Sequence, residues 1–494
     1  MIQELFIKKG IYMSSDESKR VSTANDPVLP DPVQPPGDRF IIGIVFGVLT
    51  FWLFAQSMFN IAPDIQKDIN ISNESLNLAI SATALFSGCF IVVAGGLADK
   101  FGLMRFTYLG FILSIIGSLL LIIADGSAML ITGRIIQGLS GACIMPATLA
   151  LLKVYYRGAQ RQRALSFWSI GSWGGSGFCS LMGGAIATWF GWQWIFIISI
   201  IFSIAGMLLM RGVPEKKAPR TTGETRFDNL GVLLFVIFLL CLNLVITKGA
   251  AWGWSDIITL GLLVLCVISG ILFYLTESVK KSAAFIDFSL FRNAPYSGAT
   301  FSNFMLNAVA GTLLVTNTYV QEGRGFSPFQ TGMLSIGYLI AVLVMIRVGE
   351  KILQWIGAKK PMIFGALMTG AGVALMSLTF LTDGVYISSV MAGFVLFGLG
   401  LGFYATPSTD TAISNAPSDK IGTASGVYKM ASSLGGAFGV AISASIYSAM
   451  KASGISVDIS AMTALLVNVG FCILSVLAVW GMVPASAGKT EHSQ

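Results

Sequence analysis

The stretch at residues 76–105, LNLAISATALFSGCFIVVAGGLADKFGLMR, places an uncharged apolar run directly before a short turn of glycines and charges. Residues 76–97 contain no Asp, Glu, Lys or Arg, and about 20 such residues form a helix long enough to cross a bilayer. The turn reads Gly95-Gly-Leu-Ala-Asp99-Lys100-Phe-Gly102-Leu-Met-Arg105. The stretch therefore predicts a transmembrane helix that ends in a tight, charged turn.

The composition of the whole chain has the same character. Of 494 residues, 54% are apolar and 11% are charged, whereas soluble domains carry about 25% charged residues. A soluble fold is therefore excluded. All six cysteines lie in apolar runs without a CxxC pair, so we expect no disulfide, metal site or other cofactor. Because the single histidine, His492, lies in a polar tail, proton chemistry inside a membrane would have to use carboxylates.

Apolar runs of spanning length recur from residue 40 onward and predict an all-α integral membrane protein with 14 transmembrane helices. The runs cover residues 40–62, 76–97, 105–124, 129–152, 165–190, 193–211, 229–248, 256–276, 297–320, 329–350, 360–381, 386–408, 428–449 and 460–483. Residues 1–39 are polar and proline-rich and are expected to form a disordered cytoplasmic tail; residues 485–494 form a second cytoplasmic tail.

The chain also repeats itself at an offset of 261 residues. GACIMP at 141–146 aligns with GFYATP at 402–407, and SWGG at 172–175 aligns with SLGG at 433–436. We therefore predict two six-helix bundles, 40–211 and 297–484, around a central cavity, with two inserted helices in the segment 212–296. The alternative is chance similarity between glycine-rich helices.

The distribution of lysine and arginine predicts the orientation. With the N-terminus inside, the interior loops hold nineteen of these residues and the exterior loops hold four. The positive-inside rule then places both termini in the cytoplasm. The net charge of +7 is explained by this topology and needs no nucleic-acid partner.

The helix expected at 129–152 carries Arg134 close to its start, in the pattern Arg134-x-x-Gln137-Gly138. An arginine inside a membrane marks a functional site unless its side chain reaches the interface. The turn at 95–105 resembles the signature loop of the major facilitator superfamily, and the arginine pattern resembles its second motif. The resemblance implies a gating role for Asp99, Lys100, Gly102 and Arg105, and a proton-transfer role for Arg134. The alternative for the turn is an ordinary charged loop.

Fourteen helices, the turn at 191–196 and the Phe227-Asp228-x-x-Gly231 pattern are similar to the 14-helix drug:proton antiporter branch, and longer runs resemble staphylococcal quinolone exporters. This implies a monomer in a bacterial cell membrane that moves drugs and protons across the bilayer without a cofactor. The fifth helix carries glycines for close packing. They are Gly171, Gly174, Gly175, Gly183 and Gly184. Cys179-Ser180 stands where that branch has Gly-Pro, which leaves the direction of transport open.

Few acids lie at membrane depth, and they are the candidates for proton coupling: Glu322, Glu350 and Asp410. Arg347 and Glu350 are three residues apart, so they are expected to pair on one helix face. We hypothesise that Glu350 and Asp410 exchange their basic partners for protons as the cavity opens. The alternative is a set of structural ion pairs at the inner surface.

Polar stripes on two predicted helices are candidates for the substrate cavity. Trp52, Gln56 and Asn60 follow one another at intervals of four residues in the first helix. Thr300, Asn303 and Asn307 share a face of the ninth, and Gln137 is a further candidate. Hydrogen bonding between helices is the alternative role for these groups.

The leading hypothesis is therefore a proton-coupled exporter of amphiphilic aromatic drugs, quinolone-like and cationic or zwitterionic, that works by alternating access. A proton-coupled importer of a small organic solute is the alternative within transport. A membrane-embedded enzyme would need a catalytic motif, and none is recognisable in the sequence.

Overall fold

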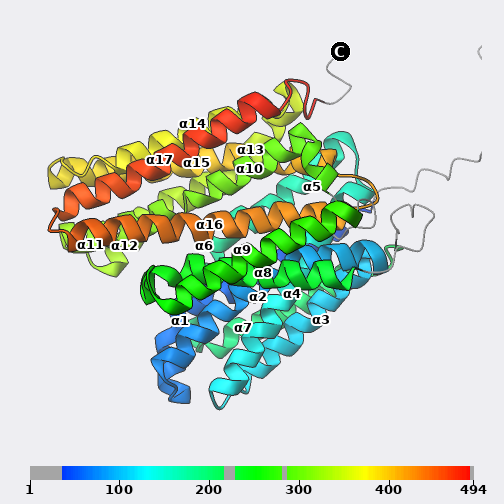
Figure 1. Ribbon diagram of the computed structural model, residues 1–494, viewed down its shortest axis with the longest axis horizontal. Helices are drawn as coiled ribbons and strands as arrows, with labels where there is room; N and C mark the ends of the chain where they lie inside the picture. The colour runs from blue at the N-terminus through cyan, green and yellow to red at the C-terminus, as the bar shows by residue number, and fades with distance from the viewer. Residues whose placement is uncertain (1–35, 216–227, 281–285, 287, 490–494) are drawn as a thin grey trace, which may run out of the picture. The chain divides into compact units, whose positions relative to one another are not determined.

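The computed structural model describes residues 36–215, 228–280, 286 and 288–489, and every regular element in these ranges is a helix (Figure 1). Most of the predicted N-terminal tail and the last five residues lie outside the described residues. We refer to residues 38–210 as the first half and to residues 294–482 as the second half.

The helices follow one another with short connections. The first half consists of α1 (Asp38–Ile69), α2 (Asn73–Phe101), α3 (Leu103–Ile122), α4 (Ser127–Tyr155), α5 (Gly158–Ser169), a π-helical turn (Ile170–Gly174), α6 (Gly175–Phe190) and α7 (Gln193–Met210). The connecting segment contains α8 (Asn229–Trp252), α9 (Ile257–Lys280) and a 3-10 helix (Phe288–Arg292). The second half consists of α10 (Ala294–Ala308), α11 (Gly311–Arg324), α12 (Pro328–Leu334), α13 (Ile336–Ile356), α14 (Lys359–Met376), α15 (Asp383–Asn415), α16 (Ile421–Ala452) and α17 (Val457–Met482).

Eleven helical stretches among the described residues are long and apolar enough to cross a membrane. The fold is thus an all-helical membrane fold, while the count of fourteen spans and the insertion of α8 and α9 stay predictions. Three expected helices are interrupted. The run at 165–190 contains the π-helical turn, the run at 297–320 divides into α10 and α11, and the run at 329–350 divides into α12 and α13.

The break between α10 and α11 lies at a close contact with α16. A Cβ atom at Gly439 of α16 would lie 1.7 Å from the carbonyl oxygen of Ala308, the last residue of α10. The two backbones therefore touch where the helix ends. Apolar periodicity does not reveal such a contact between segments far apart in the sequence.

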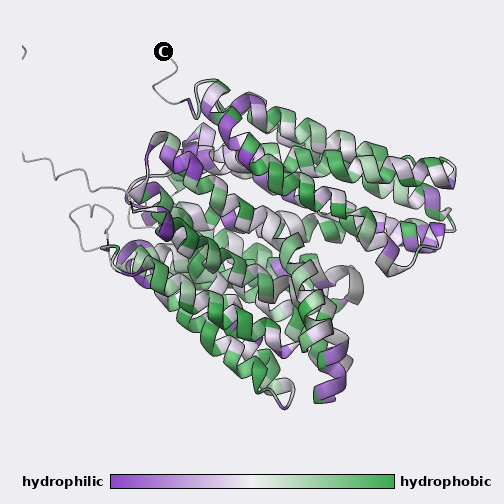
Figure 2. Ribbon diagram, turned by 180° about the vertical axis from the view of Figure 1, so that it is seen from behind, coloured by the Kyte–Doolittle hydropathy of each residue, from purple (hydrophilic) through white to green (hydrophobic). Residues whose placement is uncertain are grey.

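Helix α9 shows how the surface meets lipid. Its buried residues include Thr259, Ser269 and Glu277, whereas Ile257 is 84% exposed and other leucines, isoleucines and valines of the helix face outward. This polarity is the reverse of a helix on a water-soluble protein. Figure 2 shows hydrophobic residues along the lengths of the helices and hydrophilic residues gathered toward their ends.

The pattern of helix packing in the first half recurs in the second half, as the sequence repeat suggests. Helices α2 and α3 pack on α4 as α13 and α14 pack on α15, and α3 packs on α7 as α14 packs on α17. The contacts between the halves are matched in the same way. Helix α16 packs on α2 and α4, and its counterpart α5 packs on α13 and α15.

Both ends of the described chain lie at the same end of the molecule, next to the start of α5. Arg163 pairs with Asp38 at 2.9 Å, and Gln162 donates to the carbonyl oxygen of Gly488 at 2.8 Å. Tyr156, just after α4, donates to the carbonyl oxygen of Pro36 at 2.7 Å, and burial raises the pKa of this phenol. The segment 485–489 is therefore held against the helices, which the sequence did not suggest.

Candidate functional site

The carboxylate of Asp99 lies at the N-terminus of α16, where it joins the two halves. It accepts hydrogen bonds from the backbone N–H of Gly422 at 2.6 Å and of Thr423 at 2.8 Å, and from the Thr423 hydroxyl at 3.1 Å. The first N–H groups of a helix lack partners within the helix and carry partial positive charge. The backbones touch as well, since a Cβ atom at Gly95 would lie 2.3 Å from the Gly422 carbonyl oxygen. We call this contact the α2–α16 latch.

Gly102 holds the turn that positions the latch. Its φ of +122° is a conformation that favours glycine, and a Cβ atom there would lie 2.7 Å from the carboxyl carbon of Glu215. Glu215 accepts from the backbone N–H groups of Met104 at 3.2 Å and Arg105 at 3.0 Å, and so caps α3. Glu215 is a member of the site that sequence reasoning missed. Lys100 lies over the Phe101 ring, 5.7 Å from its centroid.

Asp410 forms a second contact between the halves. Its side chain is fully buried in α15, and it accepts from Arg161 Nε at 2.9 Å and from Gln162 Nε2 at 3.3 Å. Both partners lie in α5, at its start. Lys153, at the end of α4, also crosses to the second half and donates to the carbonyl oxygens of Ser414 and Ala416.

Glu350 pairs with Arg347 on the same face of α13, as their spacing suggested. Glu350 is only 3% exposed, and Gln354 donates to it at 3.3 Å. The Arg347 guanidinium reaches the other half: it donates to the Ser166 hydroxyl at 3.3 Å and lies 4.4 Å from the centre of the Phe167 ring. The ion pair itself therefore stays within one helix, while its arginine contacts α5.

Gln354 lies two residues before the end of α13, just as Asp99 lies two residues before the end of α2. It donates to the Ala159 carbonyl oxygen at 3.4 Å. An amide replaces a carboxylate here, so this second contact lacks the charge of the α2–α16 latch.

Arg134 lies toward the opposite end of α4 and is 1% exposed. Its Nε donates to the Ala79 carbonyl oxygen at 3.2 Å, and Nη1 donates to Gln137 Oε1 at 2.9 Å. Gln137 in turn donates to the Ser118 hydroxyl at 3.3 Å. The arginine and Gln137 thus belong to one buried hydrogen-bond network across α2, α3 and α4, within the first half.

Glu322 lies away from these groups. It accepts from the Tyr447 hydroxyl at 2.9 Å and from the Lys451 ammonium, and its side chain is 44% exposed. Because Lys451 is near the end of α16 and the latch is at its start, Glu322 lies at the other end of the molecule.

The polar stripe of the ninth predicted helix lies within the packed second half. Asn303 is fully buried and donates from Nδ2 to the Tyr428 carbonyl oxygen at 3.0 Å and to the Ser432 hydroxyl at 2.7 Å, while Asn307 donates to Asn303. This amide is therefore occupied by the contact between α10 and α16. The side chains of Gln56 and Asn60 lie outside the described residues.

Glycines of the fifth span let other helices approach closely. A Cβ atom at Gly174 would lie 2.2 Å from Leu343 of α13, and one at Gly175 would lie 3.0 Å from the half-buried Trp52 ring. Gly171 faces Val48 in the same way, at 3.1 Å. Gly183 is buried, and Gly184 lies in α6 without a described environment. The π-helical turn lies among these glycines, and such turns occur at functional sites.

A buried lysine joins the two halves deeper in the molecule. Lys429 of α16 is 7% exposed, donates to the Ser172 hydroxyl at 3.1 Å and lies 5.2 Å from the centre of the Trp168 ring. This cation was not among the predicted site residues, although its position inside a predicted apolar run is a visible signal.

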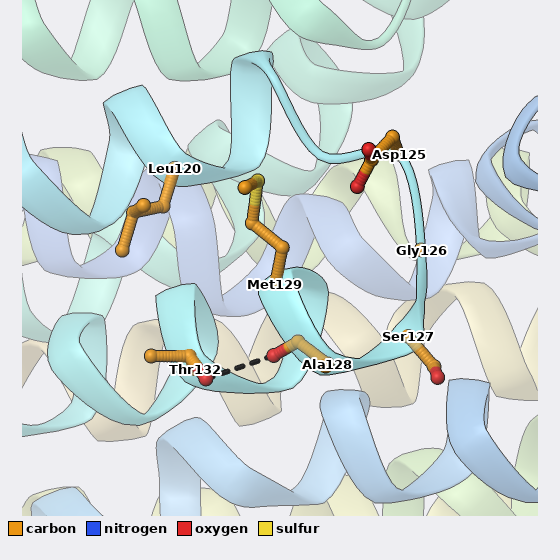
Figure 3. Close-up of a pocket in the computed structure, with 7 residues that line it drawn as sticks. All are labelled: Leu120, Asp125, Gly126, Ser127, Ala128, Met129 and Thr132. Atoms are coloured by element: carbon orange, nitrogen blue, oxygen red, sulfur yellow. Dashed lines mark hydrogen bonds between the residues drawn. The ribbon is translucent and has the colours of Figure 1, made fainter.

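Apart from the Lys429–Ser172 contact, the polar contacts described above between the halves lie toward one end of the molecule. Asp99 bonds to the start of α16, and Lys153 bonds to carbonyl groups shortly before it. Arg161 extends from the start of α5 to Asp410, and Arg347 bonds to Ser166 farther along α5. We call this the latched end. The pocket in Figure 3 is elsewhere: it is lined by the end of α3, the turn after it and the start of α4, between Leu120 and Thr132. It involves one hairpin only and does not lie between the halves.

Comparisons with known proteins agree with this architecture. A sequence profile described as Major Facilitator Superfamily matches residues 42–440. The chain is 53% identical over 447 residues to the quinolone resistance protein NorB of Staphylococcus aureus strain MRSA252, covering 90% of this chain and 96% of that protein; NorB of strain MW2 gives the same identity and coverage.

Two solved structures share the fold. The human organic anion transporter MFSD10 (TETRAN) superposes with a TM-score of 0.62 at 14% identity, covering 90% of this chain and all of that chain. The proton:xylose symporter XylE gives a TM-score of 0.62 at 15% identity, covering 92% and 97%.

Proposed function

This chain belongs to the major facilitator superfamily, and we propose that it is a proton-coupled exporter of amphiphilic aromatic drugs, quinolone-like and cationic or zwitterionic. It is a multi-pass membrane transporter. The relatives that carry the name quinolone resistance protein support the substrate class. The observation that carries the mechanism is that charged and polar contacts join the halves at one end. Opening and closing of these contacts would give alternating access.

We place the latched end in the cytoplasm, in a monomer that lies in the cell membrane of a bacterium. Basic residues gather there, including Lys153, Arg161 and Arg163, as the positive-inside rule requires of a cytoplasmic face. Both described ends of the chain lie beside them. The conformation would then be closed to the cytoplasm, and release of the latch would admit drug from inside the cell.

Asp410 is the strongest candidate for proton uptake. Its base, Arg161, belongs to the other half, so separation of the halves removes the counter-charge from a fully buried carboxylate. A buried carboxylate without its partner is strongly disfavoured, and protonation relieves that cost. Re-formation of the ion pair would release the proton as the latched end closes.

The other coupling candidates take supporting roles in this scheme. Glu350 pairs with Arg347 of its own helix, so its positive partner stays beside it when the halves part. Arg134 supplies a buried positive charge to the first half, and Glu322 is held at the opposite end by Lys451. The turn of Asp99, with Lys100, Gly102 and Arg105, forms the gate.

Export is tested by expression in a pump-deficient bacterium that is challenged with a panel of amphiphilic aromatic drugs. We expect raised resistance that a protonophore abolishes. Resistance that survives the protonophore would contradict proton coupling, and increased drug sensitivity would instead support an importer.

The coupling residues are tested in proteoliposomes by drug-driven proton release. We expect Asp410→Asn to abolish release and Glu350→Gln to reduce it. Asp38→Asn is the matched control, because Asp38 forms an exposed ion pair at the same end but within the first half. Unchanged coupling in both the Asp410 and Glu350 variants would refute the assignment.

A further inference from the structure

Lys429 lies where the two halves meet on their internal symmetry axis. Lys429 and Trp168 are equivalent positions in the 261-residue repeat, and they contact each other. Lys153 and Ser414 are a second equivalent pair, and Lys153 Nζ donates to the Ser414 carbonyl oxygen at 3.3 Å. Equivalent residues can touch only close to the axis that relates the halves. Lys429 is eight residues into α16, so it lies about 12 Å deeper than the latched end.

The charge of Lys429 has no acidic partner among the described residues. Ion pairs there use Asp38, Asp228, Glu277, Glu322, Glu350, Asp383 and Asp410, and none of them includes Lys429. Its ammonium has three donors, and its described contacts are the Ser172 hydroxyl and the face of Trp168. A buried cation without a nearby anion is costly, so an anion that binds between the halves would stabilise Lys429.

Two further buried hydroxyl groups lie close in sequence to Lys429 and to its partner Ser172. Ser425 lies one turn before Lys429 on α16, and Ser169 lies at the end of α5, three residues before Ser172. Both serines are fully buried, and both side-chain oxygens lack a hydrogen-bond partner. An ammonium flanked by hydroxyl donors and an aromatic face suits a carboxylate attached to an aromatic ring system.

We propose that Lys429 binds the carboxylate of zwitterionic aromatic substrates when the halves part at the latched end. Separation of α16 from the π-helical turn breaks the Ser172–Lys429 hydrogen bond and turns the ammonium toward the opening. The substrate carboxylate then takes the place of the Ser172 hydroxyl, while the hydroxyls of Ser169 and Ser425 supply further donors. The inference rests on the proposed function and names the chemical group by which that site selects substrates.

The test compares two probes on purified, full-length protein: a fluoroquinolone with a free ring carboxylate and the ethyl ester of the same molecule. Binding of each labelled probe is measured at equilibrium, and proton-driven uptake of each is measured in proteoliposomes. For Lys429→Gln we expect the Kd of the carboxylate probe to rise about tenfold or more, while the Kd of the ester changes less than about twofold. Lys429→Arg keeps the charge and should retain most of the binding.

Controls separate the possible outcomes. Lys351→Gln removes an exposed lysine from α13 and should leave both probes unaffected. If Lys429→Gln weakens the binding of both probes equally, or of neither, the carboxylate assignment is overturned. The lysine would then stabilise the closed state or take part in proton movement. Failure of the wild-type protein to transport either probe would overturn the proposed function itself. In that case, Lys429-dependent binding of the carboxylate probe would still support the carboxylate site.

Discussion

Asp99→Asn should weaken the α2–α16 latch and populate a state in which the halves are parted at the latched end. The carboxylate accepts three hydrogen bonds from Gly422 and Thr423 at the start of α16. Asparagine keeps one acceptor oxygen, loses the charge and presents an NH₂ group to backbone donors. Charge-assisted bonds are worth about 1.5–3 kcal/mol each against 0.5–1.5 for neutral ones, and the helix N-terminus adds up to about 2 kcal/mol. A net loss of about 2–3 kcal/mol is expected, which shifts the population ratio about 30- to 150-fold.

Pulsed electron paramagnetic resonance measures this shift between spin labels at Gln160 in α5 and Ser418 in the α15–α16 turn. Both positions are exposed and belong to different halves, and the six native cysteines are buried and free. The wild-type protein should give one short distance, and Asp99→Asn should add a longer one of comparable weight. Asp38→Asn should leave the distribution unchanged. An unchanged distribution for Asp99→Asn would refute the latch.

The remaining predictions concern backbone approach, capping and the buried arginine. Gly95→Ala places a methyl group 2.3 Å from a carbonyl oxygen of α16 and should part the same spin labels at a cost of about 1–3 kcal/mol, whereas Gly88→Ala, with 3.7 Å to its nearest neighbour, should not. Glu215→Gln removes the charged cap of α3 and should lower thermal stability in detergent by about 0.3–1 kcal/mol; unaltered melting would contradict the capping role. Arg134→Lys keeps the charge but cannot donate from two fixed nitrogens, so drug resistance should fall although expression is retained; full resistance would assign the arginine to charge alone.

Local sequence patterns predicted those parts of the site that depend on neighbouring residues. The glycines and charges at 95–105 predicted a tight, charged turn after a transmembrane helix, and three-residue spacing predicted that Arg347 pairs with Glu350. These features follow from helix geometry and turn chemistry, which short segments encode.

Contacts between distant segments could not be predicted in this way. Glu215 caps a helix whose first N–H groups lie more than a hundred residues earlier, and Arg161 reaches Asp410 across 249 residues. The close approach of α10 and α16 at Ala308 depends on a glycine of α16. Lys429 is different, because a lysine inside an apolar run is visible in the sequence, although only acids at membrane depth were predicted as coupling residues.

Drug uptake into proteoliposomes under an imposed pH gradient directly measures proton-coupled transport by this chain. With purified protein and a fluorescent fluoroquinolone, we expect that a gradient with the acidic side inside the vesicles drives drug accumulation and that a protonophore abolishes it. Asp410→Asn should leave the gradient intact and remove the accumulation. Accumulation that is equally large without the gradient, or in the Asp410 variant, would contradict proton-coupled transport by this chain.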